Sequence, residues 1–150
     1  MCEININGVN ITLTKEQLAQ IDKQRNKEIT IDNINSIEDA EKVLEGQSFH
    51  IKYTKKQFCR HKDWVNYQLE TLAKAINFLD NEKKEYILTK NSYYPYFTHD
   101  ETQGGWVYYD YGYSYGYYSN AVAAYFKTKK EAINFGKKFI HLYKEILPKF

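Results

Sequence analysis

The chain has 150 residues, of which 43% are hydrophobic, and it carries a net charge of +2. This length and composition fit a single globular domain with an N-terminal part (1–50) and a larger remainder (51–150). Two cysteines and two prolines argue against a disulfide framework and against disorder. No apolar run approaches the roughly 18 residues of a membrane span, and the opening MCEININGVN lacks signal-peptide features, so we expect a cytoplasmic protein with no membrane partner.

The opening segment predicts a β-hairpin followed by a helix. Apolar residues alternate on both sides of Asn7-Gly8, and Asn-Gly suits a two-residue turn in which both positions need a positive φ. Thr14 and Gln17 then form the pattern of a capping box. The helix that they begin has a narrow apolar stripe, so we expect it to pack on the hairpin.

A short extended piece and a second helix follow. Residues 28–32 predict a strand or extended segment, and Ser36 is a capping residue for a helix that ends at Gly46. Residues 49–53 predict another short strand.

The middle of the chain predicts a long helix. Thr54 and Gln57 form a second capping-box pattern. The apolar residues beyond them recur at helical spacing and predict a wide buried face. Its members are Trp64, Val65, Leu69, Leu72, Ala73, Ile76 and Leu79.

The last third predicts a sheet and then a helix. Residues 85–89, 92–97 and 121–126 look extended, and 98–105 form a polar loop with two glycines. Residues 129–147 predict one amphipathic helix, capped by Thr128. We therefore predict an α+β fold, with an N-terminal β-hairpin and helices and a Tyr-rich antiparallel sheet of three or more strands packed on the final helix.

Seven of the eleven residues from Tyr108 to Tyr118 are tyrosine. Every odd position from 109 to 117 is Tyr, and a straight strand would place these side chains on one face. We favour a turn at 111–114 between two strands that pair their tyrosines. One small core cannot satisfy seven hydroxyl groups, so some should reach water or a ligand.

The C-terminal segment is basic, since residues 127–150 carry seven Lys against two Glu. Its lysines form either a solvated face or an anion-binding face. Exposed Tyr rings beside them would suit a nucleotide, with the base stacked on a ring and the phosphate held by Lys. The candidate ligand-binding residues are Trp106, Tyr109, Tyr111, Tyr113, Tyr115, Lys127, Lys129 and Lys130.

Motifs for catalysis are sparse. The sequence holds no phosphate-cradling Gly-rich loop, His-Glu-x-x-His or nucleophile elbow. Cys59, His61 and His50 form a thin ligand set for zinc, which we interpret as a helix-borne Cys with exposed His. The loop His-Asp-Glu at 99–101 could do acid–base work, although a solvated loop is the commoner meaning. We assign no catalytic residue, metal or cofactor, and we favour a protein that is not an enzyme.

Five stretches carry a resemblance to a known group: INGVNITLTKEQLAQI, SIEDAEKVL, YQLETLAKAINFL, YYPYF and AYFKTKKEAINFGKKFIHLYKEIL. In this order they resemble small uncharacterised proteins of bacteriophages and prophages, especially those of Bacteroides-like hosts. The resemblance implies phage origin and a place in the cytoplasm of the host cell. It carries over no catalytic residue, because the shared ending is a structural motif.

Two functions follow as expectations. The first is a non-enzymatic binding protein that acts against host defence, with a nucleotide signal or a host defence protein as its partner. The alternative is a structural protein of the virion or a nucleic-acid-binding protein. An unpaired Tyr-rich edge would also allow the chain to form a homo-oligomer.

Overall fold

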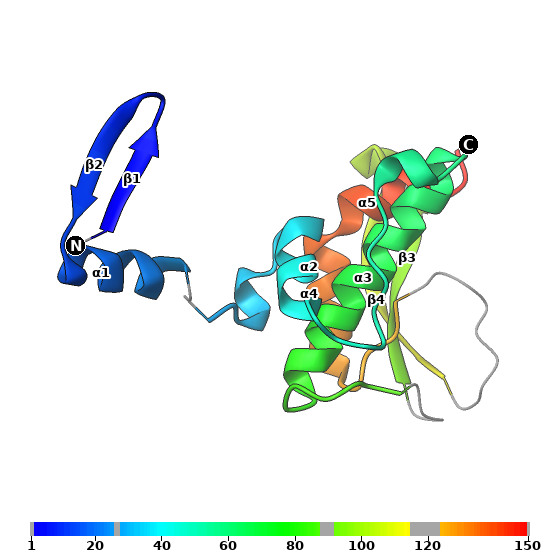
Figure 1. Cartoon of the computed structure of the whole chain (residues 1–150). Coiled ribbons are helices and arrows are strands. Elements are labelled where there is room, and N and C mark those ends of the chain that lie inside the picture. Colours follow the sequence, from blue (N-terminus) through cyan, green and yellow to red (C-terminus); the bar gives the residue numbers. More distant parts are fainter. Residues whose placement is uncertain (1, 26–27, 88–91, 115–123, 150) are drawn as a thin grey trace.

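The structure is a computed structural model that describes residues 2–25, 28–87, 92–114 and 124–149. The chain has the predicted α+β fold (Figure 1). In chain order the elements are β1 (Cys2–Ile6), β2 (Val9–Leu13), α1 (Lys15–Arg25), α2 (Ile37–Leu44), α3 (His61–Asp80), β3 (Ser92–Asp100), β4 (Gly105–Ser114), α4 (Lys129–Lys138) and α5 (Ile140–Ile146).

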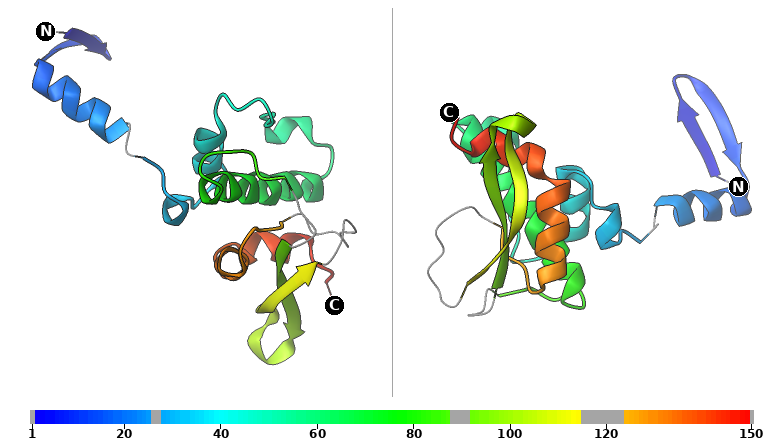
Figure 2. Two further views of the ribbon diagram at one scale, coloured as in Figure 1. Left: turned by 90° about the horizontal axis from the view of Figure 1, so that it is seen from below. Right: turned by 180° about the vertical axis from the view of Figure 1, so that it is seen from behind.

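The N-terminal hairpin forms as predicted. Strands β1 and β2 pair antiparallel about Asn7 and Gly8, whose φ angles are 52° and 84°. Val9 and Ile11 are exposed, so the described side chains of the hairpin do not show the expected packing under α1. Figures 1 and 2 show the hairpin and α1 standing apart from the remaining helices and the second sheet.

Helix α2 begins at a capping box between Ser36 and Asp39 and is followed by Gly46 with a φ of 77°. The two short strands predicted around it are absent from the described residues. Ile31–Asn33 is a 3₁₀ turn, and residues 51–54 are irregular.

Helix α3 confirms the predicted apolar face. The side chains of Val65, Leu69, Leu72, Ala73 and Ile76 are all buried. The helix begins at His61 and not at Thr54. Thr54 and Gln57 do meet, with the Thr54 N–H donating to Gln57 Oε1 at 2.7 Å, but they cap only the 3₁₀ turn Lys55–Gln57.

Strands β3 and β4 pair along their whole length, from Ser92 opposite Ser114 to Asp100 opposite Gly105. The turn between them is the 3₁₀ segment Glu101–Gln103 with Gly104 at a φ of 81°. The predicted turn at 111–114 is therefore wrong, because those residues continue the strand opposite β3.

Within the described residues the second sheet has two strands. Of the further strand predicted at 121–126, residues 121–123 lie outside the described residues. Phe126 adds a single bridge, and its N–H donates to Tyr93 O at 2.7 Å. Asn77 of α3 binds the backbone on both sides of this bridge. Asn77 Nδ2 donates to Tyr125 O at 2.7 Å, and its Oδ1 accepts from the Lys127 N–H at 3.4 Å. Of the predicted strand at 85–89, residues 85–87 are irregular and 88–89 lie outside the described residues.

The main body is layered (Figure 2): the β3–β4 sheet lies against α4 and α5, and α3 lies on their other side. The predicted single helix 129–147 is two helices, because Phe139 leaves helical geometry with φ −110° and ψ 19°. Its buried ring packs 4.8 Å from that of Phe135. The break lets α4 follow the sheet while α5 follows α3.

Gly136 sets the distance between α4 and the sheet. A Cβ atom at this position would lie 2.7 Å from Pro95 Cβ and from two carbons of the Tyr108 ring. Only a residue without a side chain allows this approach. No helix in the described ranges is both long and apolar enough to cross a membrane.

Candidate functional site

A β-bulge divides the tyrosines of β4 between the two faces of the sheet. Tyr96 lies opposite Asp110 and Phe97 lies opposite Tyr108, so Tyr109 is the extra residue. An extra residue reverses the alternation of side chains along a strand. Tyr109 therefore leaves the face of Tyr111 and joins Tyr96 on the other face, so the one-sided ladder that a straight strand would form does not include Tyr109.

The inner face of the sheet is covered by α4 and α5. Pro95 is buried, and the ring of Phe97 lies 4.4 Å from that of Tyr143. The ring of Tyr108 lies under α4, where Lys137 Nζ is 5.6 Å from its centroid. Burial raises the pKa of Tyr108, and its hydroxyl is a buried polar atom without a hydrogen-bond partner in the described structure. Part of the tyrosine run is thus core.

The outer face carries an exposed pair of rings, which we call the outer tyrosine pair. Tyr96 and Tyr109 are 52% and 66% exposed, and their ring centroids lie 6.1 Å apart. The only charged residue of β4, Asp110, lies between Tyr109 and Tyr111 in sequence and is exposed. No lysine contact with this pair occurs among the described residues.

Three tyrosines and one lysine gather at the N-terminus of α4 and form what we call the tyrosine–lysine cluster: Tyr93, Tyr111, Tyr113 and Lys129. The ring of Tyr93 lies 5.8 Å from that of Tyr111 and 4.9 Å from that of Tyr113. Lys129 Nζ lies 4.5 Å from the centroid of the Tyr111 ring. A hydrogen bond with the Tyr111 side chain and the charge of that group raise the pKa of Lys129.

The start of α4 adds further donors to this cluster. Thr128 caps the helix by accepting from the Glu131 N–H at 3.3 Å. The backbone N–H groups of the first turn and the positive end of the helix dipole favour an anion at such a position. Lys130 is exposed on the same turn. Lys127 is directed elsewhere, since its Nζ donates to Asn81 Oδ1 at 3.3 Å.

Of the remaining predicted residues, Trp106 lies at the far end of β4 from Tyr113. Its Nε1 donates to Pro148 O at 2.7 Å, and its ring meets the ring of His99 at 5.4 Å. The structure therefore brings together Tyr111, Tyr113 and Lys129 but not Trp106. Tyr115 lies outside the described residues.

The residues that the sequence offered for catalysis or metal binding do not gather into one site within the described structure. Asp100 caps the turn after β3 through Thr102, and hydrogen bonds from that residue lower the pKa of Asp100. Cys59 is exposed, and His61 Nε2 lies 2.6 Å from Glu145 Oε2. In the described parts of the chain, no three His, Cys, Asp or Glu side chains lie close enough to hold a metal ion.

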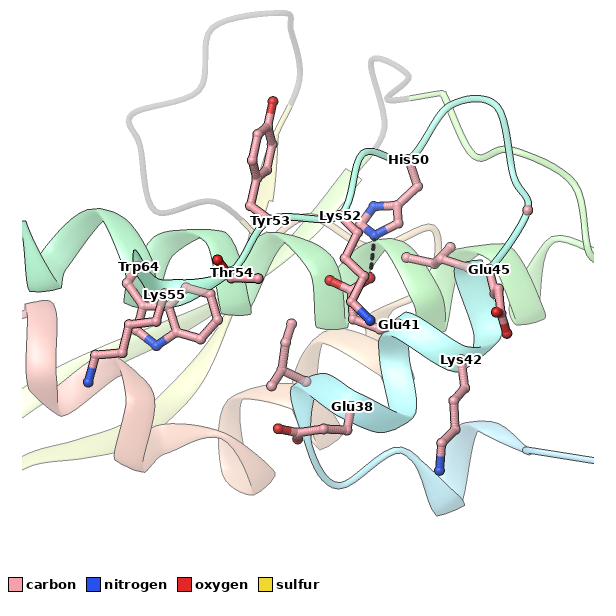
Figure 3. A pocket seen from close by; sticks show the side chains of 13 residues that line it. Glu38, Glu41, Lys42, Glu45, His50, Lys52, Tyr53, Thr54, Lys55 and Trp64 are labelled. Atoms are coloured by element: carbon pink, nitrogen blue, oxygen red, sulfur yellow. Dashed lines mark hydrogen bonds and ion pairs between the residues drawn. The ribbon is translucent and has the colours of Figure 1, made fainter. Parts of the chain in front are cut away.

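A buried polar network that sequence reasoning missed links α2, α3 and the segment between them. Tyr67 O–H donates to Glu41 Oε1 at 2.5 Å, and His50 Nε2 lies 2.8 Å from Glu41 Oε2. The Tyr53 N–H donates to the Tyr67 hydroxyl at 2.9 Å. Burial and the bond to Glu41 raise the pKa of Tyr67, which keeps its hydroxyl as a donor. Figure 3 shows that His50 and Glu41 line a cavity.

Comparison of the chain with protein-family models, with curated proteins and with solved structures found no match.

Proposed function

We propose that this protein is a non-enzymatic, phage-encoded binding protein that acts against host defence by sequestering a nucleotide signal at the tyrosine–lysine cluster. The observation that carries the proposal is the position of Lys129 over the Tyr111 ring at the start of α4, 4.5 Å from its centroid. The phage origin rests on the resemblance of the sequence to phage proteins. The nucleotide rests on the chemistry of the cluster.

The cluster offers both parts of a nucleotide a partner. A base can stack on a tyrosine ring, because every base has an apolar π-face. A phosphate can bind the ammonium groups of Lys129 and Lys130 together with the first backbone N–H groups of α4. Lys129, like any lysine whose pKa is not lowered, carries a charge at neutral pH.

The test is a binding measurement with a matched pair of lysine variants. Cyclic and linear nucleotides should raise the melting temperature of the wild-type protein, and Lys129→Met should weaken the binding roughly tenfold. Lys137→Met is the control, because Lys137 also lies over a tyrosine ring, 5.6 Å from that of Tyr108, but near the C-terminal end of α4. Equal binding by both variants would remove the cluster as the site.

The outer tyrosine pair supports a second function, that of a virion-associated structural or nucleic-acid-binding protein. Two exposed rings with no lysine beside them in the described structure suit contact with a protein surface more than contact with a phosphate. A homo-oligomer seen in sedimentation that dissociates on Tyr109→Ala would favour this function. Binding of single-stranded nucleic acid lost on the same change would favour its nucleic-acid form.

A further inference from the structure

One cavity lies away from the tyrosines of the β3–β4 sheet. It has a volume of about 680 Å³ and lies between α2 and the segment that leads to α3 (Figure 3). The side chains of Ile37 and Leu44 supply its apolar lining from α2, and Trp64 of α3 bounds it. Cavities of this size hold small molecules in other proteins.

One buried atom beside this cavity has no partner. The His50 side chain is only 4% exposed and lines the cavity, and Nδ1 is buried with no hydrogen bond in the described structure. The carboxylate of Glu41 accepts hydrogen bonds, so the 2.8 Å contact assigns the ring hydrogen to Nε2. In the neutral ring Nδ1 then presents a lone pair. Because buried polar atoms are nearly always paired, this one lacks a donor that water or a ligand at the wall of the cavity would supply.

Hydrogen bonds through Glu41 hold the His50 ring in place. Glu41 is 9% exposed and holds the His50 ring with one oxygen and the Tyr67 hydroxyl with the other. Tyr67 in turn accepts the Tyr53 N–H at 2.9 Å. Such supporting hydrogen bonds hold a binding group in one orientation before the ligand arrives.

The charges around the cavity have both signs and are not paired with one another. Lys52 and Lys55 line it from the segment before α3, and Glu38, Lys42 and Glu45 line it from α2. None of these five side chains takes part in an ion pair within the described chain. Figure 3 shows Lys55 beside the indole of Trp64, at the other end of the cavity from His50.

We propose that this cavity is a binding site for a small molecule that carries an N–H donor for His50, a flat apolar body for Trp64 and an anionic group for Lys55. A nucleotide and an aromatic amino acid both have this chemistry. The site uses none of the residues of the tyrosine–lysine cluster, so it does not depend on the function proposed there.

The experiment measures binding of adenosine and guanosine monophosphate, tryptophan and phenylalanine to the whole chain by calorimetry, at up to about 1 mM. At least one of these probes should bind, and the probe that binds tells whether the ligand is a nucleotide or an amino acid. Lys55→Gln should weaken that binding roughly tenfold. Lys56→Gln is the matched control, because both lysines are exposed in the turn Lys55–Gln57 but only Lys55 lines the cavity.

His50→Gln should also weaken the binding by at least about tenfold, with circular dichroism to establish that the variant folds. The probes are also measured on the Lys129→Met background, which removes the contribution of the tyrosine–lysine cluster, and the cavity should still bind its probe there. The proposal is overturned if no probe binds the wild-type protein, or if Lys55→Gln binds as the wild type does. Loss of binding on Lys129→Met alone would assign the ligand to the cluster and would also overturn the proposal.

Discussion

The two faces of the β3–β4 sheet are built from similar residues but have different surroundings. On the inner face, Tyr108 lies under α4 at a glycine that admits no side chain. On the outer face, Tyr109 is 66% exposed beside Tyr96. Two adjacent tyrosines thus occupy opposite environments, as the alternation of side chains along a strand requires. The bulge adds that Tyr109 and Tyr111, two residues apart, also lie on opposite faces.

Residue type alone therefore does not decide whether a tyrosine of β4 is packed or exposed. An inner ring contributes to stability through packing, and an outer ring leaves stability nearly unaffected and is available for contact.

The core behind the inner face should respond most strongly. Leu72 of α3 is 1% exposed within the main cluster, so Leu72→Ala should cost about 2–5 kcal/mol in the free energy of unfolding. Urea unfolding measures the loss. Lys62→Ala, at an exposed site of the same helix, is the control and should change stability by less than about 0.5 kcal/mol. A loss below about 1 kcal/mol for Leu72→Ala would mean that this face of α3 does not pack in the core.

The close approach of α4 to the inner face should be the next most sensitive feature. Gly136→Ala places a Cβ atom 2.7 Å from Pro95 Cβ and the Tyr108 ring. This overpacking should destabilise the protein by about 1–3 kcal/mol, although Ala is the better helix former. Asn134→Ala, at an exposed site of α4, should be neutral or slightly stabilising. If Gly136→Ala is the stabilising change of the two, the contact between α4 and the sheet is looser than the structure shows.

Removal of one buried hydroxyl group, that of Tyr143, should stabilise the protein. Tyr143 is 1% exposed, burial raises its pKa, and its hydroxyl has no hydrogen-bond partner in the described structure. Tyr143→Phe should therefore stabilise the protein by about 1 kcal/mol in thermal unfolding. Tyr67→Phe is the contrasting variant, because its hydroxyl bonds Glu41 and the Tyr53 N–H, and it should destabilise the protein. A loss of stability for both would show that Tyr143 has a partner in solution.

The outer face should respond least. Tyr96 is 52% exposed, so Tyr96→Ala should change the free energy of unfolding by no more than about 0.5 kcal/mol. Denaturant unfolding of this variant beside the wild type provides the measurement. A loss above about 1 kcal/mol would indicate that the outer face is covered in the folded protein.

Local patterns predicted the parts of the fold that depend on neighbours in sequence. The hairpin at Asn7-Gly8 follows from turn geometry, and the buried face around Leu72 follows from helical spacing. The bulge at Tyr109 depends on the register with β3, and the break at Phe139 depends on packing against two layers. Neither has a signal in the local pattern.

The candidate site was predicted only in part for the same reason. Tyr111, Tyr113 and Lys129 do lie together, because the end of β4 lies beside the start of α4. Trp106 does not join them, since it lies at the opposite end of a fully extended strand. The network of Glu41, His50 and Tyr67 joins residues 9 and 26 positions apart, and no spacing rule connects them.

The separation of packed inner tyrosines from exposed outer tyrosines is tested by the melting temperatures of Tyr108→Ala and Tyr109→Ala, measured side by side. The account predicts a loss of roughly 4–8 °C for Tyr108→Ala, equivalent to about 2 kcal/mol, and a change within about 1 °C for Tyr109→Ala. Equal losses for the two variants would contradict it, because both rings would then belong to the core and the outer face would hold no free contact surface.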